Sequence, residues 1–325
     1  MAKSKNYGIL CIILSAFCFA CMNLFVKKAG NLPSFEKSFF RNIIAFFFAF
    51  GVIVKSKEKV NIPKDALPAL FMRSIGGTVG ILCNFYAIDH LVIADASMLN
   101  KLSPFFVLIF SYLILKEKVK LYQGICIIVA FIGSLFVIKP TADIIHNPAS
   151  LMGMLGGLGA GIAYTFVRIA GKKGVKSPVI VAFFSGFSSL VTLPLMIMDF
   201  EPMTAAQLMF LILAGLAATG GQFGITLAYT FAPAREISVY DYSQIIFATI
   251  LGILFLGELP DKYSFVGYGI IISASLVMFI LNNRNLLKKI NHFNSGKGAV
   301  ITFVACFASG SCNSLFNIFC CDYTE

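Results

Sequence analysis

Two charged residues, Lys101 and Asp241, lie within long apolar stretches of the sequence. A charge inside a membrane span costs roughly 2.5–3.5 kcal/mol on insertion scales, so such residues are functional candidates by default. Polar side chains surround both charges at spacings of three and four, which places most of each set on one helix face. The two sets are Ser97, Asn100, Lys101 and Ser103, and Ser238, Asp241, Tyr242 and Gln244.

These two sets favour a polar substrate-binding site. Lys101 suits a substrate carboxylate, and Asp241, the one clear acid inside a span, is the candidate for proton coupling. The alternative is that the same side chains only hold helices together, since interhelical polar contacts stabilise membrane bundles by up to about 1–2 kcal/mol. The sequence leaves open whether Lys101 and Asp241 pair directly.

Three arginines also fall within apolar segments. Arg41 and Arg73 lie within about two turns of a helix end, and Arg168 lies close to one. A long side chain at such a place can reach the lipid headgroups. We expect Arg73 and Arg168 to do so.

Several uncharged residues complete the predicted site. Pro104 lacks the N–H that would bond the Asn100 carbonyl, so it predicts a kink that leaves an exposed acceptor. Gly80 and Gly221 belong to matching glycine groups, which suit either close helix packing or sliding during transport, and are candidate gate residues. Candidates for aromatic and hydrogen-bonding walls are Asn84, Tyr86, Tyr164, Gln222 and Tyr229.

The composition indicates that membrane helices position these residues. The 325 residues are 58% hydrophobic and 13% charged, against about 45–50% and 25% in soluble domains. Continuous apolar runs of about 20 residues span a bilayer as helices. A soluble enzyme, a secreted disulfide scaffold and a nucleic-acid-binding domain are thereby excluded. The predicted helices are 7–26, 38–54, 66–88, 94–115, 121–138, 151–170, 178–198, 206–231, 237–256 and 263–281.

Lys and Arg set the predicted orientation. They concentrate in the loops that lie inside if the N-terminus is cytoplasmic, such as 55–64, 116–120 and 172–176. The opposite loops hold few. By the positive-inside rule, both ends of the ten-helix unit face the cytoplasm of a plasma-membrane protein. The net charge of +11 is therefore a topology signal and not a sign of nucleic-acid binding.

The sequence repeats itself at an offset of 141 residues. Phe25-Val26-Lys27 recurs as Phe166-Val167-Arg168, and Glu117 recurs as Glu258. Each copy holds five helices, an odd number, so the second copy must enter the membrane from the opposite side. We expect an all-α fold with repeats at 1–145 and 146–290 and a tail, 291–325, of open role. Within the tail, 298–320 is apolar enough for an eleventh helix.

Particular segments of both halves resemble a known family. They are FFRNIIAFF, FYAIDHLVIADASMLNKLSPFFVLIFSYLILKEK, LAYTFAPAREISVYDYSQ and ILFLGE. They resemble the two modules of EamA-type carriers in the drug/metabolite transporter superfamily. This resemblance implies a ten-helix carrier of small metabolites, often an exporter, with no catalysis and no cofactor. It implies a cavity lined by the third and fourth helices and their repeats. An Arg is frequent in the family at the position of Arg41, so the resemblance makes Arg41 as much a substrate-binding candidate as a headgroup contact.

We therefore expect a secondary transporter of a small organic metabolite, amino-acid-like or another carboxylate, that works as an exporter. Its expected partners are this substrate and the bilayer. The first alternative to an exporter is an importer or exchanger with the same fold. A membrane protein that does not transport, or a membrane enzyme, is a further alternative with a different function. No metal is expected, because Cys18 and Cys21 lack the further ligands that zinc needs.

Overall fold

The structure is a computed structural model that describes residues 2–30, 32–56, 62–90, 99–138, 148–257 and 259–282. Ser97, Glu258 and the whole tail 291–325 lie outside these ranges. The chain divides into two units, Met1–Met278 and Phe279–Glu325. Everything that follows concerns the first unit, which holds both sets of site residues.

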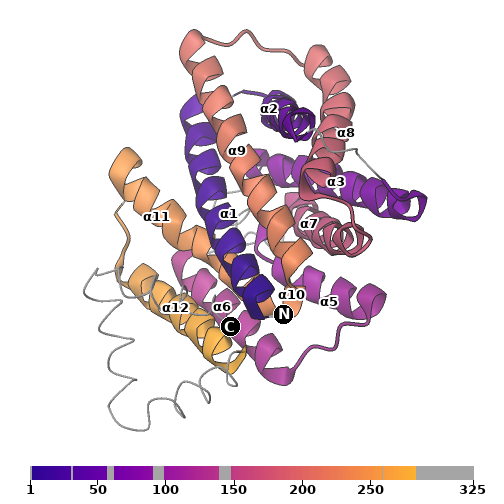
Figure 1. Ribbon diagram of the computed structural model, residues 1–325. Helices are drawn as coiled ribbons and strands as arrows, with labels where there is room; N and C mark the ends of the chain where they lie inside the picture. Colours follow the sequence, from indigo (N-terminus) through magenta and orange to yellow (C-terminus); the bar gives the residue numbers. More distant parts are fainter. Residues whose placement is uncertain are drawn as a thin grey trace, which may run out of the picture. The chain divides into compact units, whose positions relative to one another are not determined.

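Long helices form most of the described chain (Figure 1). The first half contains α1 (Ala2–Ala29), α2 (Ser34–Lys55), α3 (Leu67–His90), α5 (Ser103–Leu115) and α6 (Leu121–Ile138). The second half contains α7 (Ala149–Lys172), α8 (Ser177–Met198), α9 (Ala205–Phe231), α11 (Ser243–Leu256) and α12 (Lys262–Asn282). Among the described residues, nine helical segments are long and apolar enough to cross a membrane, and α5 is a shorter apolar helix. The predicted all-α membrane fold is confirmed.

The fourth and ninth predicted spans are interrupted at the site residues. In the first half the chain turns at Lys101 and Leu102 before α5 begins. In the second half, α10 (Ala234–Ile237) leads into the 3₁₀ helix η3 (Ser238–Tyr242), and then into α11. Pro104 therefore lies in the first turn of α5, where its missing N–H is tolerated, and does not kink a continuous helix. The continuous helix expected at 94–115 is thus wrong at Lys101, whereas the predicted ninth span is helical throughout Ala234–Leu256 and only changes to 3₁₀ geometry at η3.

Contacts between helices follow the repeat. α1 packs along α9, and α3 packs along α7. In both contacts the first helix of one repeat packs against the third helix of the other. α5 contacts α7 as α11 contacts α1, and α2 contacts α8, its own equivalent. Figure 1 shows α1 beside α9 and α2 beside α8. The core is therefore built between the halves, and neither half forms it alone.

The two halves run in opposite directions. Gln207 Nε2 donates to the Ala29 carbonyl oxygen at 3.2 Å, so α1 ends beside the start of α9. α2 starts there and, at 22 residues and 1.5 Å per residue, runs about 33 Å to the other face. α7 ends at that other face, where Lys173 Nζ lies 3.3 Å from Asp65 Oδ2 of the short helix η1 (Lys64–Ala66) before α3. The first helices of the two repeats are thus antiparallel.

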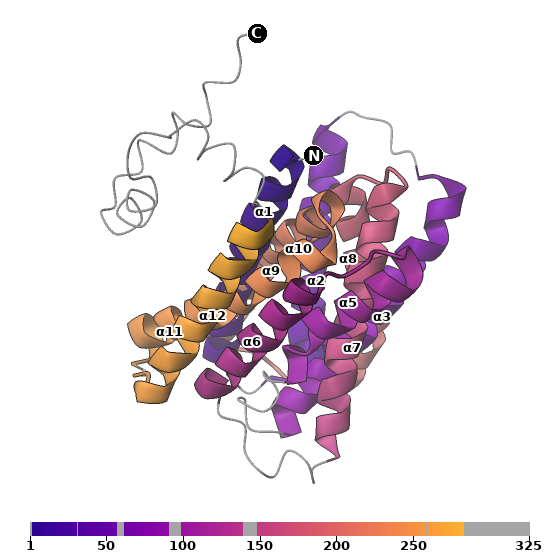
Figure 2. The same cartoon turned by 90° about the horizontal axis from the view of Figure 1, so that it is seen from below.

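Glycines permit the close packing between the halves. A Cβ on Gly159 of α7 would lie 2.7 Å from the Gly76 carbonyl oxygen of α3. At the equivalent contact, a Cβ on Gly221 of α9 would lie 2.6 Å from the Phe19 ring of α1. Figures 1 and 2 both draw α6 beside α12, where a Cβ on Gly133 would approach the Gly267 carbonyl oxygen to 3.0 Å. Small residues here let helix backbones approach each other.

Candidate functional site

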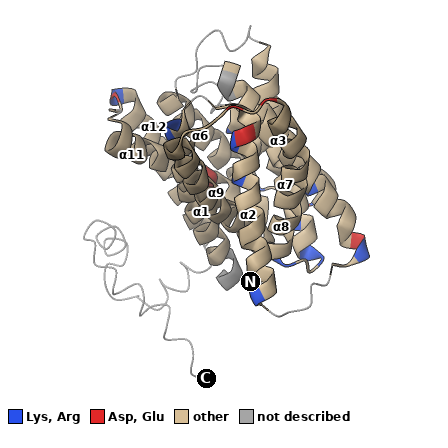
Figure 3. Cartoon of the chain, turned by 90° about the horizontal axis from the view of Figure 1, so that it is seen from above, with Lys and Arg blue, Asp and Glu red and all other residues tan. Residues whose placement is uncertain are grey.

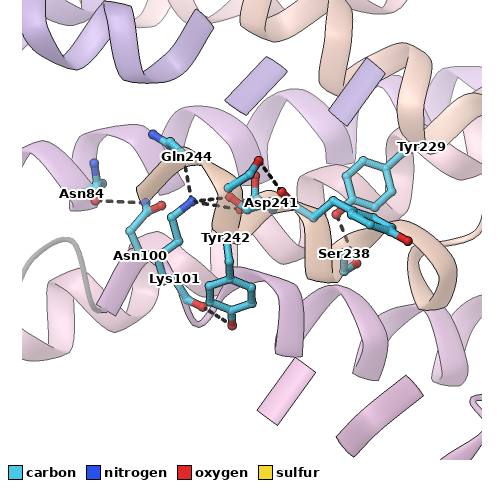
Figure 4. Close-up of polar contacts among 10 residues, drawn as sticks. Asn84, Asn100, Lys101, Tyr229, Ser238, Asp241, Tyr242 and Gln244 are labelled. Carbon is cyan, nitrogen blue, oxygen red and sulfur yellow. Dashed lines mark hydrogen bonds and ion pairs between the residues drawn. The ribbon is translucent and has the colours of Figure 1, made fainter. Parts of the chain in front are cut away.

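An ion pair joins the two halves where their helices are interrupted. Lys101 Nζ lies 3.0 Å from Asp241 Oδ2, with both residues less than a tenth exposed. The same ammonium donates to Gln244 Oε1 at 2.7 Å and to the Asp241 carbonyl oxygen at 3.3 Å. Figure 4 shows Gln244 and Asp241 converging on the Lys101 nitrogen. The pairing that the sequence left open is therefore present.

The interrupted backbone takes part in this site. Because the helix breaks at Lys101, the Phe105 N–H bonds the Leu102 carbonyl and not that of Lys101. The Lys101 carbonyl oxygen instead accepts a hydrogen bond from the Tyr242 hydroxyl at 3.1 Å (Figure 4). Discontinuous helices commonly place unwound backbone beside the binding sites of inverted-repeat transporters. The breaks thus place two helix ends of opposite halves side by side.

Side chains on both sides extend the polar contacts. Asn100 Nδ2 donates to Asn84 Oδ1 on α3 at 3.0 Å. The Tyr229 hydroxyl lies 3.4 Å from Ser238 Oγ, and the Tyr229 ring stacks on Tyr164 of α7 at 5.1 Å between centroids. Figure 4 shows the Asn100–Asn84 and Tyr229–Ser238 contacts on either side of Lys101. Most of the predicted wall residues therefore lie around the ion pair.

The ion pair has a clear energetic consequence. Removing two charges from water costs several kcal/mol per ion, and their attraction compensates only when the hydrogen bonds are well made. All three N–H donors of a lysine ammonium have partners at Lys101. In this conformation Lys101 is neutralised by Asp241, and any change at one of the two residues leaves the other charge buried.

Arg73 does not reach the lipid headgroups, contrary to expectation. It is 2% exposed and donates to Gln222 Oε1 of α9 at 2.9 Å. Its guanidinium carbon lies 3.9 Å from the centroid of the Phe184 ring on α8. The prediction for Arg73 failed because distance from a helix end does not determine which way the side chain points.

Arg41 is also buried, at 6% exposed. Its Nε–H donates to Met22 Sδ at 3.2 Å, and its Nη1–H donates to Asn42 Oδ1 at 3.4 Å. Neither partner carries a charge. Among the described residues, no carboxylate lies within ion-pair distance of Arg41 or Arg73.

The structure does not bring every candidate to the ion pair. Tyr86 is 44% exposed and stacks on His90 at 4.0 Å between ring centroids. Ser103 and Pro104 are buried at the start of α5, directly after the break. Gly80 lies at the contact of α3 with α7, where a Cβ would approach Gly156 and Ala160 backbone atoms to 3.1 Å.

A second polar cluster lies at the face where α7 ends. Glu117, in the loop after α5, pairs with Arg168 at 3.4 Å and Lys172 at 2.8 Å. Arg168 also donates to the Thr230 carbonyl oxygen at 2.9 Å, so it bonds protein groups where headgroup contact was expected. Burial alone would raise the Glu117 pKa, but hydrogen bonds from Lys172 and Ser111 and the charges of Arg168 and Lys172 outweigh it and hold the pKa below its usual value.

These features define a class of protein. Apolar helices in two inverted copies, with interrupted helices that meet at a buried ion pair, are the architecture of a polytopic membrane transporter. The chain belongs to the EamA-like transporter family, whose model matches residues 6–139 and 147–280 separately. It is a secondary transporter of the drug/metabolite transporter superfamily and not an enzyme.

Similar proteins support this assignment. The chain is 31% identical over 273 residues to the pseudopaline exporter CntI of Pseudomonas aeruginosa, with 83% of this chain and 95% of that protein covered. It is 26% identical to solute carrier family 35 member G1 of Mus musculus, over 82% and 76% of the two chains. It is also 26% identical to an S-adenosylmethionine uptake transporter of Rickettsia bellii, over 89% and 98%.

A solved crystal structure shows the same fold. It superimposes with a TM-score of 0.73 over 87% of this chain and 99% of the other chain. The two sequences are 15% identical. This likeness supports the arrangement of the helices and says nothing of substrate.

Proposed function

We propose that this transporter exports a small organic metabolite with a carboxylate group, amino-acid-like or another carboxylate, by alternating access between its two inverted repeats. The observation that carries the proposal is the Lys101–Asp241 ion pair. It joins the break before α5 in one half to η3 in the other. Rocking of one half against the other would therefore act directly on this pair.

Asp241 is the proposed coupling residue. Proton uptake by its carboxylate would remove the negative charge that holds Lys101. The freed ammonium could then bind a substrate carboxylate, with Gln244 remaining as a hydrogen-bond partner. Proton uptake at Asp241 would thus favour substrate binding at Lys101, which links the movements of proton and substrate without any bound cofactor.

The direction of transport is inferred from the similar proteins. Among the similar proteins, CntI of Pseudomonas aeruginosa is an exporter and the Rickettsia bellii protein is an uptake transporter. The first has the higher identity, and it favours export here. Uptake or exchange by the same fold is the second candidate.

Net transport by purified protein tests this function. Proteoliposomes would be loaded in turn with labelled amino acids and carboxylic acids, and release would be followed under an imposed pH gradient. We expect at least one compound to leave about tenfold faster than from protein-free liposomes, and Asp241→Asn to abolish the difference. Lys55→Gln, at an exposed position, is the control with one charge removed. Equal release from all liposomes for every compound would contradict the proposal.

The cytoplasmic position of the N-terminus is part of the same proposal. Single cysteines at Lys55 and Lys116 would lie inside, and those at Lys28 and Lys262 outside; all four positions are exposed. In a cysteine-free background, a membrane-impermeant maleimide added to intact cells should label only the outer pair. Labelling of the inner pair alone would reverse the orientation.

A further inference from the structure

The two buried arginines leave positive charge uncompensated inside the protein. Arg41 of α2 and Arg73 of α3 are 6% and 2% exposed. Their described hydrogen-bond partners, Met22, Asn42 and Gln222, are all uncharged. An isolated buried charge costs several kcal/mol, so proteins keep such charges where a ligand or a function needs them.

Arg73 is held with its guanidinium directed into the helix bundle. Gly77 lies one turn after Arg73 in α3. A Cβ on Gly77 would collide with Arg73 Nη1 and with the Phe184 ring. Side chains on a helix normally point toward its N-terminus, but this one extends the opposite way, away from the nearer helix end. Gly77 and Phe184 hold it there, and its buried Nε–H has no hydrogen-bond partner.

The two arginines belong to the same region as the ion pair. Both arginines lie against one stretch of α8: Arg73 lies over Phe184, and Asn42, the partner of Arg41, donates to Ser188 Oγ one turn further along at 2.9 Å. Tyr164 of α7 lies within electrostatic reach of both guanidiniums and of Asp241, and it stacks on Tyr229 beside the ion pair. Arg73 also donates to Gln222 of α9, which lies two turns before Tyr229 on the same helix, and Tyr229 contacts Ser238 beside the ion pair.

The charge balance of this region defines the ligand that suits it. Asp241 neutralises Lys101, so Arg41 and Arg73 remain as two positive charges. The other buried carboxylate in the described chain, Glu36, lies in the first turn of α2 and accepts a hydrogen bond from the Glu201 N–H. A planar guanidinium matches a carboxylate with two parallel hydrogen bonds. Two guanidiniums on separate helices match two carboxylates.

We propose that Arg41 and Arg73 form the anion-binding part of the substrate site, and that the transported metabolite is a small dicarboxylate. This inference rests on the proposed transport function and narrows its substrate class. A dicarboxylate would bring the buried charge near zero when it binds, which lets the loaded site move through the transport cycle without an unpaired charge. The proposal separates two tasks. Arg41 and Arg73 hold the dianion while Lys101 is paired with Asp241, and Lys101 becomes available to a carboxylate only when Asp241 takes up a proton.

Ligand-induced thermal stabilisation in detergent tests the proposal. The probes are malonate, succinate and glutarate, each compared with its half-amide, which has nearly the same size and only one carboxylate. We expect at least one dicarboxylate to raise the melting temperature at a concentration about tenfold below that needed for its half-amide, because a charge-assisted hydrogen bond contributes more than a neutral one. Arg41→Gln and Arg73→Gln should each remove this preference.

Two further variants keep the test decisive. Lys55→Gln removes an exposed positive charge and should keep the full preference for dicarboxylates. If Arg73→Gln does not yield folded protein, Arg73→Lys retains the charge and loses the two-pronged geometry, and should reduce the preference. Equal binding of half-amides, a preference that survives both arginine changes, or no stabilisation by any dicarboxylate would overturn the proposal.

Transport separates this proposal from the one on which it rests. If proteoliposomes release neutral or singly charged compounds but no dicarboxylate, the transporter function stands and the dicarboxylate assignment fails. If they release no compound of any charge, the proposed function itself fails.

Discussion

Lys101 and Tyr242 occupy equivalent positions in the two repeats, and the Tyr242 hydroxyl donates a hydrogen bond to the Lys101 carbonyl oxygen at 3.1 Å. A residue of the first repeat is therefore hydrogen-bonded to the equivalent residue of the second. The two side chains differ in chemistry, because Lys101 carries an ammonium and Tyr242 a phenol. The site is thus symmetric in backbone and asymmetric in charge.

Breaking the ion pair should cost far more stability than removing it. Lys101→Met leaves the Asp241 carboxylate buried without a cation, which costs about 3–5 kcal/mol. Replacing both residues, as Lys101→Met with Asp241→Leu, removes both charges and should recover most of this loss. Thermal unfolding in detergent measures both variants, with Lys55→Met at an exposed position as the control. If the double variant were as unstable as the single one, the unpaired Asp241 carboxylate would not be the cause of the lost stability.

The α3–α7 contact should tolerate no added methyl group. A Cβ on Gly159 would lie 2.7 Å from backbone atoms of Gly76 and Gly80, so Gly159→Ala must push the helices apart and destabilise by about 1–3 kcal/mol. Gly124→Ala in α6 is the matched control, because nothing lies within 4 Å of its Cβ and Ala favours helix by about 0.5–1 kcal/mol. Equal melting temperatures for the two variants would argue against close packing of α3 on α7.

The Glu117 cluster predicts a pH dependence of stability. The folded-state pKa of Glu117 lies below its usual value, so the ionised carboxylate stabilises the fold at neutral pH. That contribution is complete above the unfolded-state pKa and is lost as the pH falls through the lower folded-state pKa. Glu117→Gln should therefore melt below the wild type at pH 7, and the gap should narrow as the pH drops below the usual carboxyl range. A gap that stays constant down to acid pH would contradict the ion-pair assignment.

The fold could be predicted from the sequence, because its signals are continuous. Apolar runs long enough to span a bilayer mark each helix, and the repeat at an offset of 141 residues implies two inverted halves. The interruption before Ser103 was not predicted, since 94–115 has the length of one membrane span, which predicts a single helix. Pro104 is the local signal for it, and it indicates a new first turn as readily as a kink.

The site was only partly predictable for a different reason. Lys101 and Asp241 stand out because charges are rare in membrane spans and each has polar neighbours at helical spacing, but nothing in the sequence shows that they pair. Arg73 and Gln222 come from separate helices, α3 and α9, and only packing brings them to 2.9 Å. The signal for Arg73 is Gly77, one turn away, which provides room for the guanidinium inside the bundle.

Net flux through the charge-free variant tests the central claim most directly. The double replacement Lys101→Met with Asp241→Leu should retain the fold, so its behaviour reports on transport and not on stability. In proteoliposomes with an imposed pH gradient, we expect substrate release through the wild type to exceed release from protein-free liposomes. Release through the double variant should equal that from protein-free liposomes. Wild-type flux through the folded double variant would show that transport does not need the ion pair between the repeats.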